Sequence, residues 1–82
     1  MEIVLKKQPQ KYLAALDTNT RNKLFKALDS LSRLEGNIVK LKGRINEYRF
    51  KIDHYRIIFE YDGKKGQIII VSAINTRTNT KY

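Results

Sequence analysis

The fold is decided by Glu47–Tyr61, a stretch that reads EYRFKIDHYRIIFEY. Apolar and charged residues alternate along it with a period of two, which predicts strands with one buried face. A two-residue turn at Asp53 and His54 would make these strands a hairpin. The residues then paired on one face are Ile52 with Tyr55, Phe50 with Ile57, and Tyr48 with Phe59. Because all six are apolar or aromatic, we expect this face to be core, and a one-residue slip would expose it.

The other face of the hairpin carries like charges opposite one another. In the same register the opposed residues are Lys51 and Arg56, Glu47 and Glu60, and Arg49 and Ile58. A like-charged pair is destabilising by roughly a few tenths of a kcal/mol. A solvated face is the simplest interpretation of any one lysine, but such a face tends to pair opposite signs. The three cations Arg49, Lys51 and Arg56 are therefore predicted to converge on a phosphate, which suits the planar fork of arginine.

Upstream of the hairpin the pattern predicts a strand and two helices. Met1–Lys7 alternates and carries lysines, as an edge strand does. Pro9 suits the first turn of a helix that would end near Asp17–Asn19. That helix would include Tyr12, Leu13, Ala15 and Leu16. A second helix follows after about three residues, so the two should pack as an antiparallel hairpin.

The second helix has both a start and a stop signal. Asp17 or Thr18 can cap its first turn, and Gly36 with Asn37 would end it. Spacings of three and four place its apolar residues on a single stripe. These residues are Leu24, Ala27, Leu28, Leu31 and Leu34.

The remaining segments complete an α+β domain. Residues Asn37–Asn46 form a basic connection or a short strand, and Glu47–Ile52, Tyr55–Tyr61 and Gln67–Ala73 form three strands. Residues 62–66 form a hairpin loop and Asn75–Tyr82 a polar tail. The expected order is β-α-α-β-β-β, with the helical hairpin packed on one face of an antiparallel sheet in a single domain of residues 1–82.

Composition limits the chemistry that the chain can perform. Its 82 residues include 17 Lys or Arg against 8 Asp or Glu, a net charge of +9. Such a field attracts nucleic acid, an acidic protein or an anionic surface. The chain has no cysteine and one histidine, so we expect neither a metal site nor a cofactor. No apolar run is long enough for a signal peptide or a membrane span, so we expect a cytoplasmic protein.

The catalytic groups of most nucleases are also missing from the sequence. It offers no Ser/His/Asp or Cys/His triad and no glycine-rich phosphate loop, and its few carboxylates are too scattered for a two-metal site. A nuclease of this composition would be metal-independent. With RNA as substrate, the 2′-OH of the substrate could serve as the nucleophile, and the protein would position and neutralise the phosphate.

Several other residues are candidates, each with a structural alternative. Lys40, Lys42 and Arg44 could guide a nucleic-acid backbone or belong to a solvated loop. His54 could donate a proton or be a turn residue without a role. The tail residues Arg77, Lys81 and Tyr82 could fold back beside the basic face or lie free of it. A tyrosine among cations could act as a general base.

The sequence resembles the RelE/ParE superfamily of type II toxin–antitoxin toxins. The resemblance rests on the hairpin Y-R-x-K-x-x-x-Y-R-I-I-F-E, the aliphatic strand after it and a basic tail that ends in tyrosine, and it covers nearly the whole chain. It implies a toxin neutralised by a cognate antitoxin encoded nearby, in a toxin–antitoxin hetero-oligomer. The RelE branch cleaves mRNA on the ribosome, and its catalytic residues correspond here to Arg49, Lys51, Arg56, Arg77 and Tyr82.

The resemblance also implies a role for each of these residues. Arg56 would bind the scissile phosphate, Lys51 and Arg49 would assist it, Arg77 would support the leaving side, and Tyr82 would be the base or a stacking platform. The candidates that remain for RNA binding are Lys40, Lys42, Arg44, His54 and Lys81. The tail departs from the family pattern G-H-R-x-x-x-Y, because it has no histidine and its arginine lies one residue farther from the tyrosine.

Two other functions remain open at this stage. The ParE branch has the same fold but inhibits DNA gyrase, and it usually keeps fewer of the cations. Retention of Arg49, Lys51 and Arg56 therefore favours an RNase. A basic module that binds nucleic acid without catalysis would account equally well for the charge.

Overall fold

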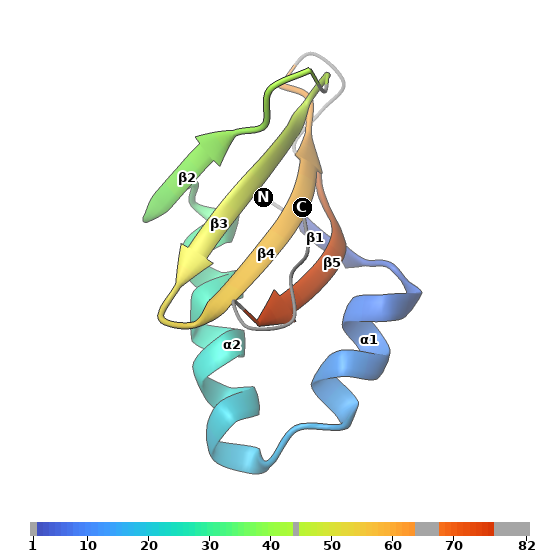
Figure 1. Cartoon of the computed structure of the whole chain (residues 1–82), viewed down its shortest axis with the longest axis vertical. Helices are drawn as coiled ribbons and strands as arrows, with labels where there is room; N and C mark the ends of the chain where they lie inside the picture. The colour runs from blue at the N-terminus through green and yellow to red at the C-terminus, as the bar shows by residue number, and fades with distance from the viewer. Residues whose placement is uncertain (1, 44, 64–67, 77–82) are drawn as a thin grey trace.

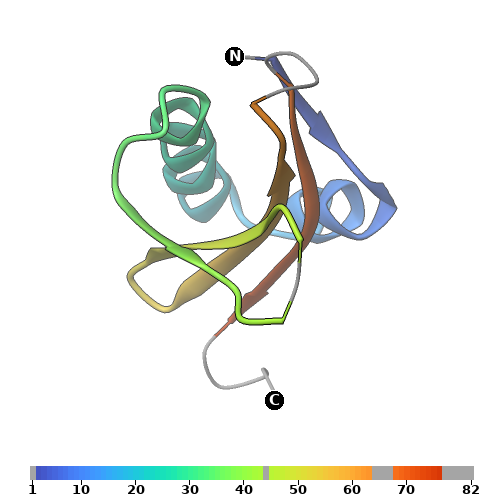
Figure 2. The same ribbon diagram turned by 90° about the horizontal axis from the view of Figure 1, so that it is seen from above.

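The computed structural model describes residues 2–43, 45–63 and 68–76 and shows two helices along a twisted five-stranded sheet (Figures 1 and 2). Its elements in chain order are β1 (Glu2–Leu5), α1 (Lys7–Ala14), α2 (Thr18–Ser32), β2 (Asn37–Lys40), β3 (Glu47–Ile52), β4 (Tyr55–Tyr61) and β5 (Ile68–Thr76). The strand order is β1-β5-β4-β3-β2. This confirms the α+β prediction and the edge position of β1.

Two features of the sheet go beyond the prediction. The segment left open between a connection and a strand forms β2, which pairs antiparallel with β3 at the sheet edge. In addition, β1 pairs parallel with β5, while the other neighbouring strands pair antiparallel. The sheet is therefore mixed rather than purely antiparallel. The two helices carry the chain from β1 at one edge of the sheet to β2 at the other.

The register of the β3–β4 hairpin is the predicted one. Phe50 pairs with Ile57, and the turn lies at Asp53, which has a φ of 50°, and His54. Phe50, Ile57 and Phe59 are all buried. Alternation thus places the bulky residues on the face of the sheet toward the helices, and we call the opposite side the outer face.

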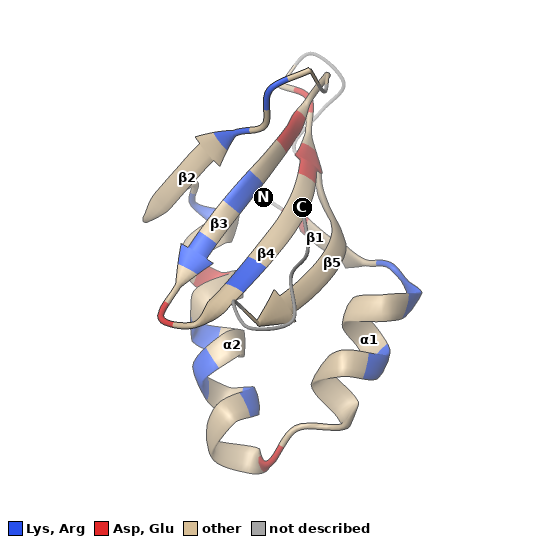
Figure 3. Cartoon of the chain, viewed as in Figure 1, with Lys and Arg blue, Asp and Glu red and all other residues tan. Residues whose placement is uncertain are grey.

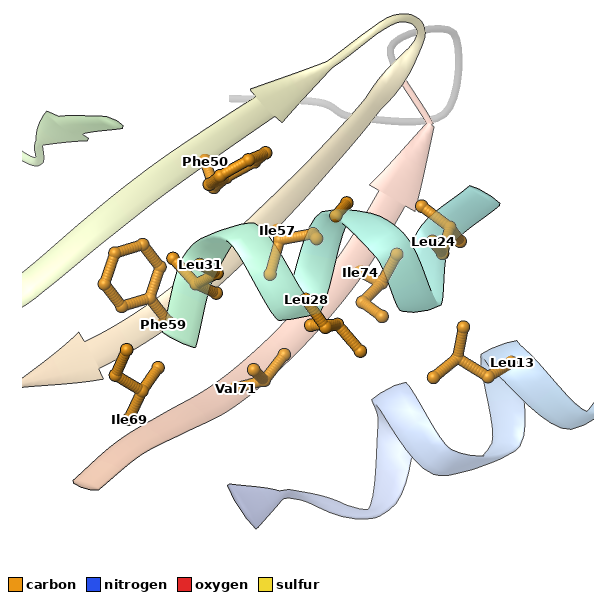
Figure 4. Packing of buried hydrophobic residues seen from close by; sticks show 11 residues of the cluster. Leu13, Leu24, Leu28, Leu31, Phe50, Ile57, Phe59, Ile69, Val71 and Ile74 are labelled. Carbon is orange, nitrogen blue, oxygen red and sulfur yellow. The ribbon is translucent and has the colours of Figure 1, made fainter. Parts of the chain in front are cut away.

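The core lies between this sheet and the helices (Figure 4). Leu24, Leu28 and Leu31 of α2 and Leu13 of α1 point toward the sheet residues. The sheet contributes Phe50, Ile57, Phe59, Ile69, Val71 and Ile74, all buried. The predicted stripe of α2 is confirmed except for Leu34, which is exposed because the helix ends at Ser32.

The helix boundaries are set by two capping interactions. Asp17 caps α2, since its carboxylate accepts hydrogen bonds from the backbone N–H and the hydroxyl of Thr20. Helix α1 ends at Ala14, before the predicted end near Asp17–Asn19. Its last carbonyls are bound by the guanidinium of Arg21, which donates to Leu13, Ala14 and Leu16. These bonds hold the connection between the helices in a tight turn.

Candidate functional site

The basic cluster predicted on β3 and β4 lies on the outer face of the sheet. We give this name to Arg49, Lys51 and Arg56, which alternate with the core residues of the two strands. Lys51 pairs directly with Arg56, as the hairpin register requires. Figure 3 shows basic positions on the halves of β3 and β4 nearer their shared turn and acidic positions on the halves farther from it. The outer face therefore has a cationic end and an anionic end.

Two cations of the cluster, Arg49 and Lys51, are not neutralised by the acidic residues described around them. Neither Arg49 nor Lys51 forms an ion pair with any residue in the described ranges. The Nε atom of Arg49 is buried and has no hydrogen-bond partner among those residues. A buried donor without a partner is unfavourable. Because Arg49 and Lys51 have no ion-pair partner within the described residues, an anionic ligand with several acceptor oxygens would stabilise this arrangement.

The acidic end of the outer face is partly neutralised by the protein itself. Glu60, which pairs with Glu47 across the hairpin, forms an ion pair of 3.3 Å with Lys6 after β1. Both side chains of this ion pair are about half exposed, so it contributes little to stability. The two ends of the face therefore differ: Glu60 at the anionic end has an ion-pair partner, whereas Arg49 and Lys51 at the cationic end have none among the described residues.

Two residues of the basic cluster, Lys51 and Arg56, belong to a longer row across the sheet, which we call the tip row. In this row Asn37 of β2 pairs with Lys51, Lys51 with Arg56, and Arg56 with Asn75 of β5. Residues in register share a face, so two amides flank the two cations. Asn75 was predicted to lie in a polar tail, but β5 continues past the predicted end at Ala73 to Thr76.

A β-bulge explains why Asn75 lies on the outer face. Ile58 pairs with Ala73 but the next residue, Phe59, pairs with Val71, so Ser72 is an extra residue in β5. A bulge reverses the alternation of the strand beyond it. Ile74 therefore enters the core and its neighbour Asn75 faces outward. The sequence signal was the irregular spacing of aliphatic residues around Ser72-Ala73, which alternation alone does not resolve.

The turn that joins β3 and β4 is held to α2. Lys23 forms an ion pair with Asp53. The hydrogen bond and charge of Lys23 lower the pKa of Asp53, and His54 adds to this effect. The same interaction raises the pKa of Lys23. The Lys23–Asp53 ion pair thus connects the hairpin turn, next to the tip row, to α2.

The other predicted site residues are placed less closely together. Lys40 pairs with Tyr48 and so shares the core-side face of the sheet, although it is exposed. Lys42 is exposed in the loop after β2, and His54 is exposed at the hairpin turn. Arg44, Arg77, Lys81 and Tyr82 lie outside the described residues. The structure thus brings together Arg49, Lys51 and Arg56 but does not bring Lys40 onto their face.

No group of three or more His, Cys, Asp or Glu side chains suited to hold a metal ion occurs in residues 2–43, 45–63 and 68–76. Neither α1 nor α2 has the length and hydropathy that a helix needs to cross a bilayer.

The chain matches one known protein family and is similar to several solved structures. The sequence model of the family described as ParE toxin of type II toxin-antitoxin system, parDE, matches residues 3–80. None of the curated proteins compared with the chain matches it. Among solved structures, the isolated RelE toxin of E. coli is similar with a TM-score of 0.74 and 21% identity, over 98% of this chain and 87% of that one.

Two archaeal toxin–antitoxin complexes contain chains of similar structure. The RelE-RelB complex of Pyrococcus horikoshii OT3 matches with a TM-score of 0.75 and 22% identity, over 96% of this chain and 97% of that one. The RelB-RelE complex of Methanococcus jannaschii matches with a TM-score of 0.70 and 23% identity, over 92% and 91%. At these identities the likeness shows a shared fold.

Proposed function

This chain belongs to the ParE toxin family of type II toxin–antitoxin systems, within the RelE/ParE superfamily, and we propose that it is a metal-independent mRNA endoribonuclease that acts on the ribosome. The observation that carries the proposal is the basic cluster. Lys51 and Arg56 are paired with like charge, and neither Arg49 nor Lys51 forms an ion pair with a described residue. A scissile phosphate would supply the negative charge that Arg49 and Lys51 do not receive from the described residues.

The reaction that fits such a site needs no group beyond the RNA and the protein. The 2′-oxygen attacks the adjacent phosphorus, and its proton passes to a base. A new O2′–P bond forms as the P–O5′ bond breaks, and the leaving O5′ takes up a proton. Arg56 and Lys51 neutralise the charge that builds on the phosphoryl oxygens, while Arg49 orients the phosphate. For this site the superfamily resemblance implies Tyr82 as the base or a stacking platform and Arg77 at the leaving side.

The partners follow from the same proposal. We propose that mRNA is bound in the ribosome, in the cytoplasm, and that Lys42, Arg44, His54, Lys40 and Lys81 contribute to RNA binding. An antitoxin encoded nearby would neutralise the toxin in a hetero-oligomer. A net charge of +9 favours an antitoxin with an acidic or amphipathic segment that covers the basic or apolar surface.

Primer extension on mRNA after brief expression tests the activity directly. We expect cleavage inside codons of translated messages, with little cleavage of free RNA. Arg56→Ala should reduce cleavage by about 10²–10³-fold, as the loss of one transition-state donor does. Because it removes a cation from a like-charged pair, it should leave the free energy of unfolding level or slightly higher. If the variant unfolds, Arg56 is structural and the assignment of the site is wrong.

A second candidate function is inhibition of DNA gyrase, which the match to the ParE family model favours. The two functions separate cleanly in parallel assays of the purified protein. Inhibition of gyrase supercoiling with intact mRNA would support this candidate and overturn the RNase. Tight binding of RNA without either activity would indicate a binding module.

A further inference from the structure

The two amides of the tip row have no role in the proposal above. We propose that Asn37 and Asn75 bind the neutral groups of a single RNA strand, a ribose hydroxyl or a base edge, on either side of the phosphate held by Lys51 and Arg56. This inference rests on the proposed RNA substrate and extends the site from one phosphate to its flanking nucleotides. It makes the row amide, cation, cation, amide across β2, β3, β4 and β5.

The spacing of the row suits a ligand longer than one phosphate. Neighbouring strands lie about 4.8 Å apart, so the three spacings from Asn37 to Asn75 span about 14 Å. The cations occupy the two central positions and the amides the two ends. A phosphate at the centre therefore leaves its attached sugars, and the bases beyond them, over the ends of the row.

The side chains at the two ends of the tip row suit different RNA groups from the side chains at its centre. An amide both donates and accepts hydrogen bonds, as the 2′-hydroxyl does and as base edges do. A cation donates only, and suits phosphate oxygens. The tip row therefore matches the order of groups along a strand of RNA, with a charged group between neutral ones.

Both amides are available for a ligand. Within the described residues, the side chains of Asn37 and Asn75 make no hydrogen bond; Asn37 is exposed and Asn75 half-buried. The amide of Gln8 shows the structural alternative. It donates to the carbonyl of Ile74 at 2.9 Å and accepts from its N–H at 2.8 Å, and so completes the backbone bonding of β5. Asn75, one residue later, has no such partner for its side chain among the described residues.

The Ser72 bulge supports a functional placement of Asn75. Bulges redirect side chains and occur often beside active sites. Here the bulge turns an asparagine outward next to Arg56 and sends Ile74 into the core. Without it, the polar residue would point toward the core and the aliphatic one toward solvent. The bulge is thus what completes the tip row.

Salt-dependent binding of RNA tests the inference. A labelled single-stranded RNA of about eight nucleotides and the DNA of the same sequence would be titrated with wild type, Asn75→Ala, Asn37→Ala and Lys51→Ala at several salt concentrations. Asn22→Ala, an exposed asparagine on α2, is the matched control. Circular dichroism of each variant would establish that it is folded.

Neutral and charged contacts give different signatures in this experiment. Each tip-row asparagine variant should lose about three- to tenfold in RNA affinity with an unchanged slope of log K against log salt. Lys51→Ala should reduce that slope by about one, and Asn22→Ala should bind as wild type does. A loss seen with RNA alone identifies a ribose hydroxyl as the ligand group, and a loss with both oligonucleotides identifies a base edge.

Failure of the inference can be told from failure of the proposed function. If wild type binds RNA and Lys51→Ala changes the salt slope, but the asparagine variants bind as wild type does, the amides have no role. A changed salt slope in an asparagine variant would also overturn the inference, since the effect would then come from the cations. If wild type binds neither oligonucleotide and cleaves no mRNA on ribosomes, the proposed function fails as well.

Discussion

At the scale of single residues, Gly36 is required by a ring rather than by a helix end. It lies after α2 at a φ of 115°, where residues other than glycine are strained, and a Cβ there would be 2.9 Å from the Phe50 ring. Phe50 is buried in the core opposite Ile57 and cannot withdraw freely. The sequence predicted that Gly36 ends the helix, but α2 ends earlier, at Ser32. The close approach of Gly36 to Phe50 could not be predicted from the sequence.

We expect Gly36→Ala to lower the free energy of unfolding by about 2–4 kcal/mol, from backbone strain and overpacking together. Urea denaturation measures it. Gly43→Ala is the matched control, because Gly43 also has a positive φ, of 73°, but nothing lies within 4 Å of its added Cβ. It should be the less destabilising change. Equal losses in the two variants would mean that the Phe50 contact contributes nothing.

At the scale of elements, Arg21 joins the two helices. Its guanidinium donates to the carbonyls of Leu13, Ala14 and Leu16 at 2.9, 3.2 and 2.7 Å. Arg21→Met keeps the aliphatic stem but leaves these carbonyls at the end of α1 without their donor. We expect the free energy of unfolding to fall by about 1–3 kcal/mol, which chemical denaturation measures. Arg33→Met, which removes an exposed arginine that pairs with Asp29 and Glu35, should cost less.

The cap of α2 predicts a dependence of stability on pH. The hydroxyl and the N–H of Thr20 hold the pKa of Asp17 below its usual value. Since the folded pKa is the lower one, the stabilisation is complete above the ordinary pKa of about 3.9 and is lost as the pH falls through the folded pKa. Asparagine also caps helices but does not titrate.

Asp17→Asn should therefore lose less stability than wild type between about pH 6 and pH 2.5. Urea midpoints of the two proteins across this range measure the difference. Asp53, whose pKa Lys23 lowers, is present in both proteins and contributes equally. Parallel curves for wild type and variant would show that Asp17 contributes no charge-dependent stability.

The elements also show which parts of the fold the sequence could predict. The β3–β4 register was predictable because alternation and turn chemistry agree over Glu47–Tyr61. The strand β2 was left open because four residues, NIVK, carry too little periodicity to distinguish a strand from a loop. The bulge at Ser72 was missed because alternation alone does not locate an extra residue, and the role of Arg21 because its partners are backbone carbonyls of another segment. Periodicity predicts which face of a strand or helix a side chain occupies, but not which groups that side chain contacts.

At the scale of the whole molecule, stability and the proposed function reside on opposite faces of one sheet. The core face and the helices bury the aliphatic cluster, while the outer face carries the cations. Alternation couples the two faces, since the same strands supply both. The basic cluster could therefore be predicted together with the core, from one register. The outward position of Asn75 could not, because it depends on the bulge, and Tyr82 lies outside the described residues.

This division predicts that the site is kept at the expense of stability. Lys51→Gln relieves its repulsion with Arg56 and should raise the free energy of unfolding by about 0.2–1 kcal/mol at low salt. At about 1 M NaCl the Debye length falls to about 3 Å, so the gain should largely disappear. Urea denaturation at both salt concentrations measures this.

Lys40→Gln is the matched control, because Lys40 is also a strand lysine but pairs with Tyr48 instead of a cation. It should change stability less, and by similar amounts at the two salt concentrations. Inorganic phosphate should stabilise wild type more than Lys51→Gln, because a ligand that binds only the folded state adds to its stability. If Lys51→Gln instead lowers the free energy of unfolding at low salt, Lys51 stabilises the fold. Its position opposite Arg56 would then be explained without a bound ligand.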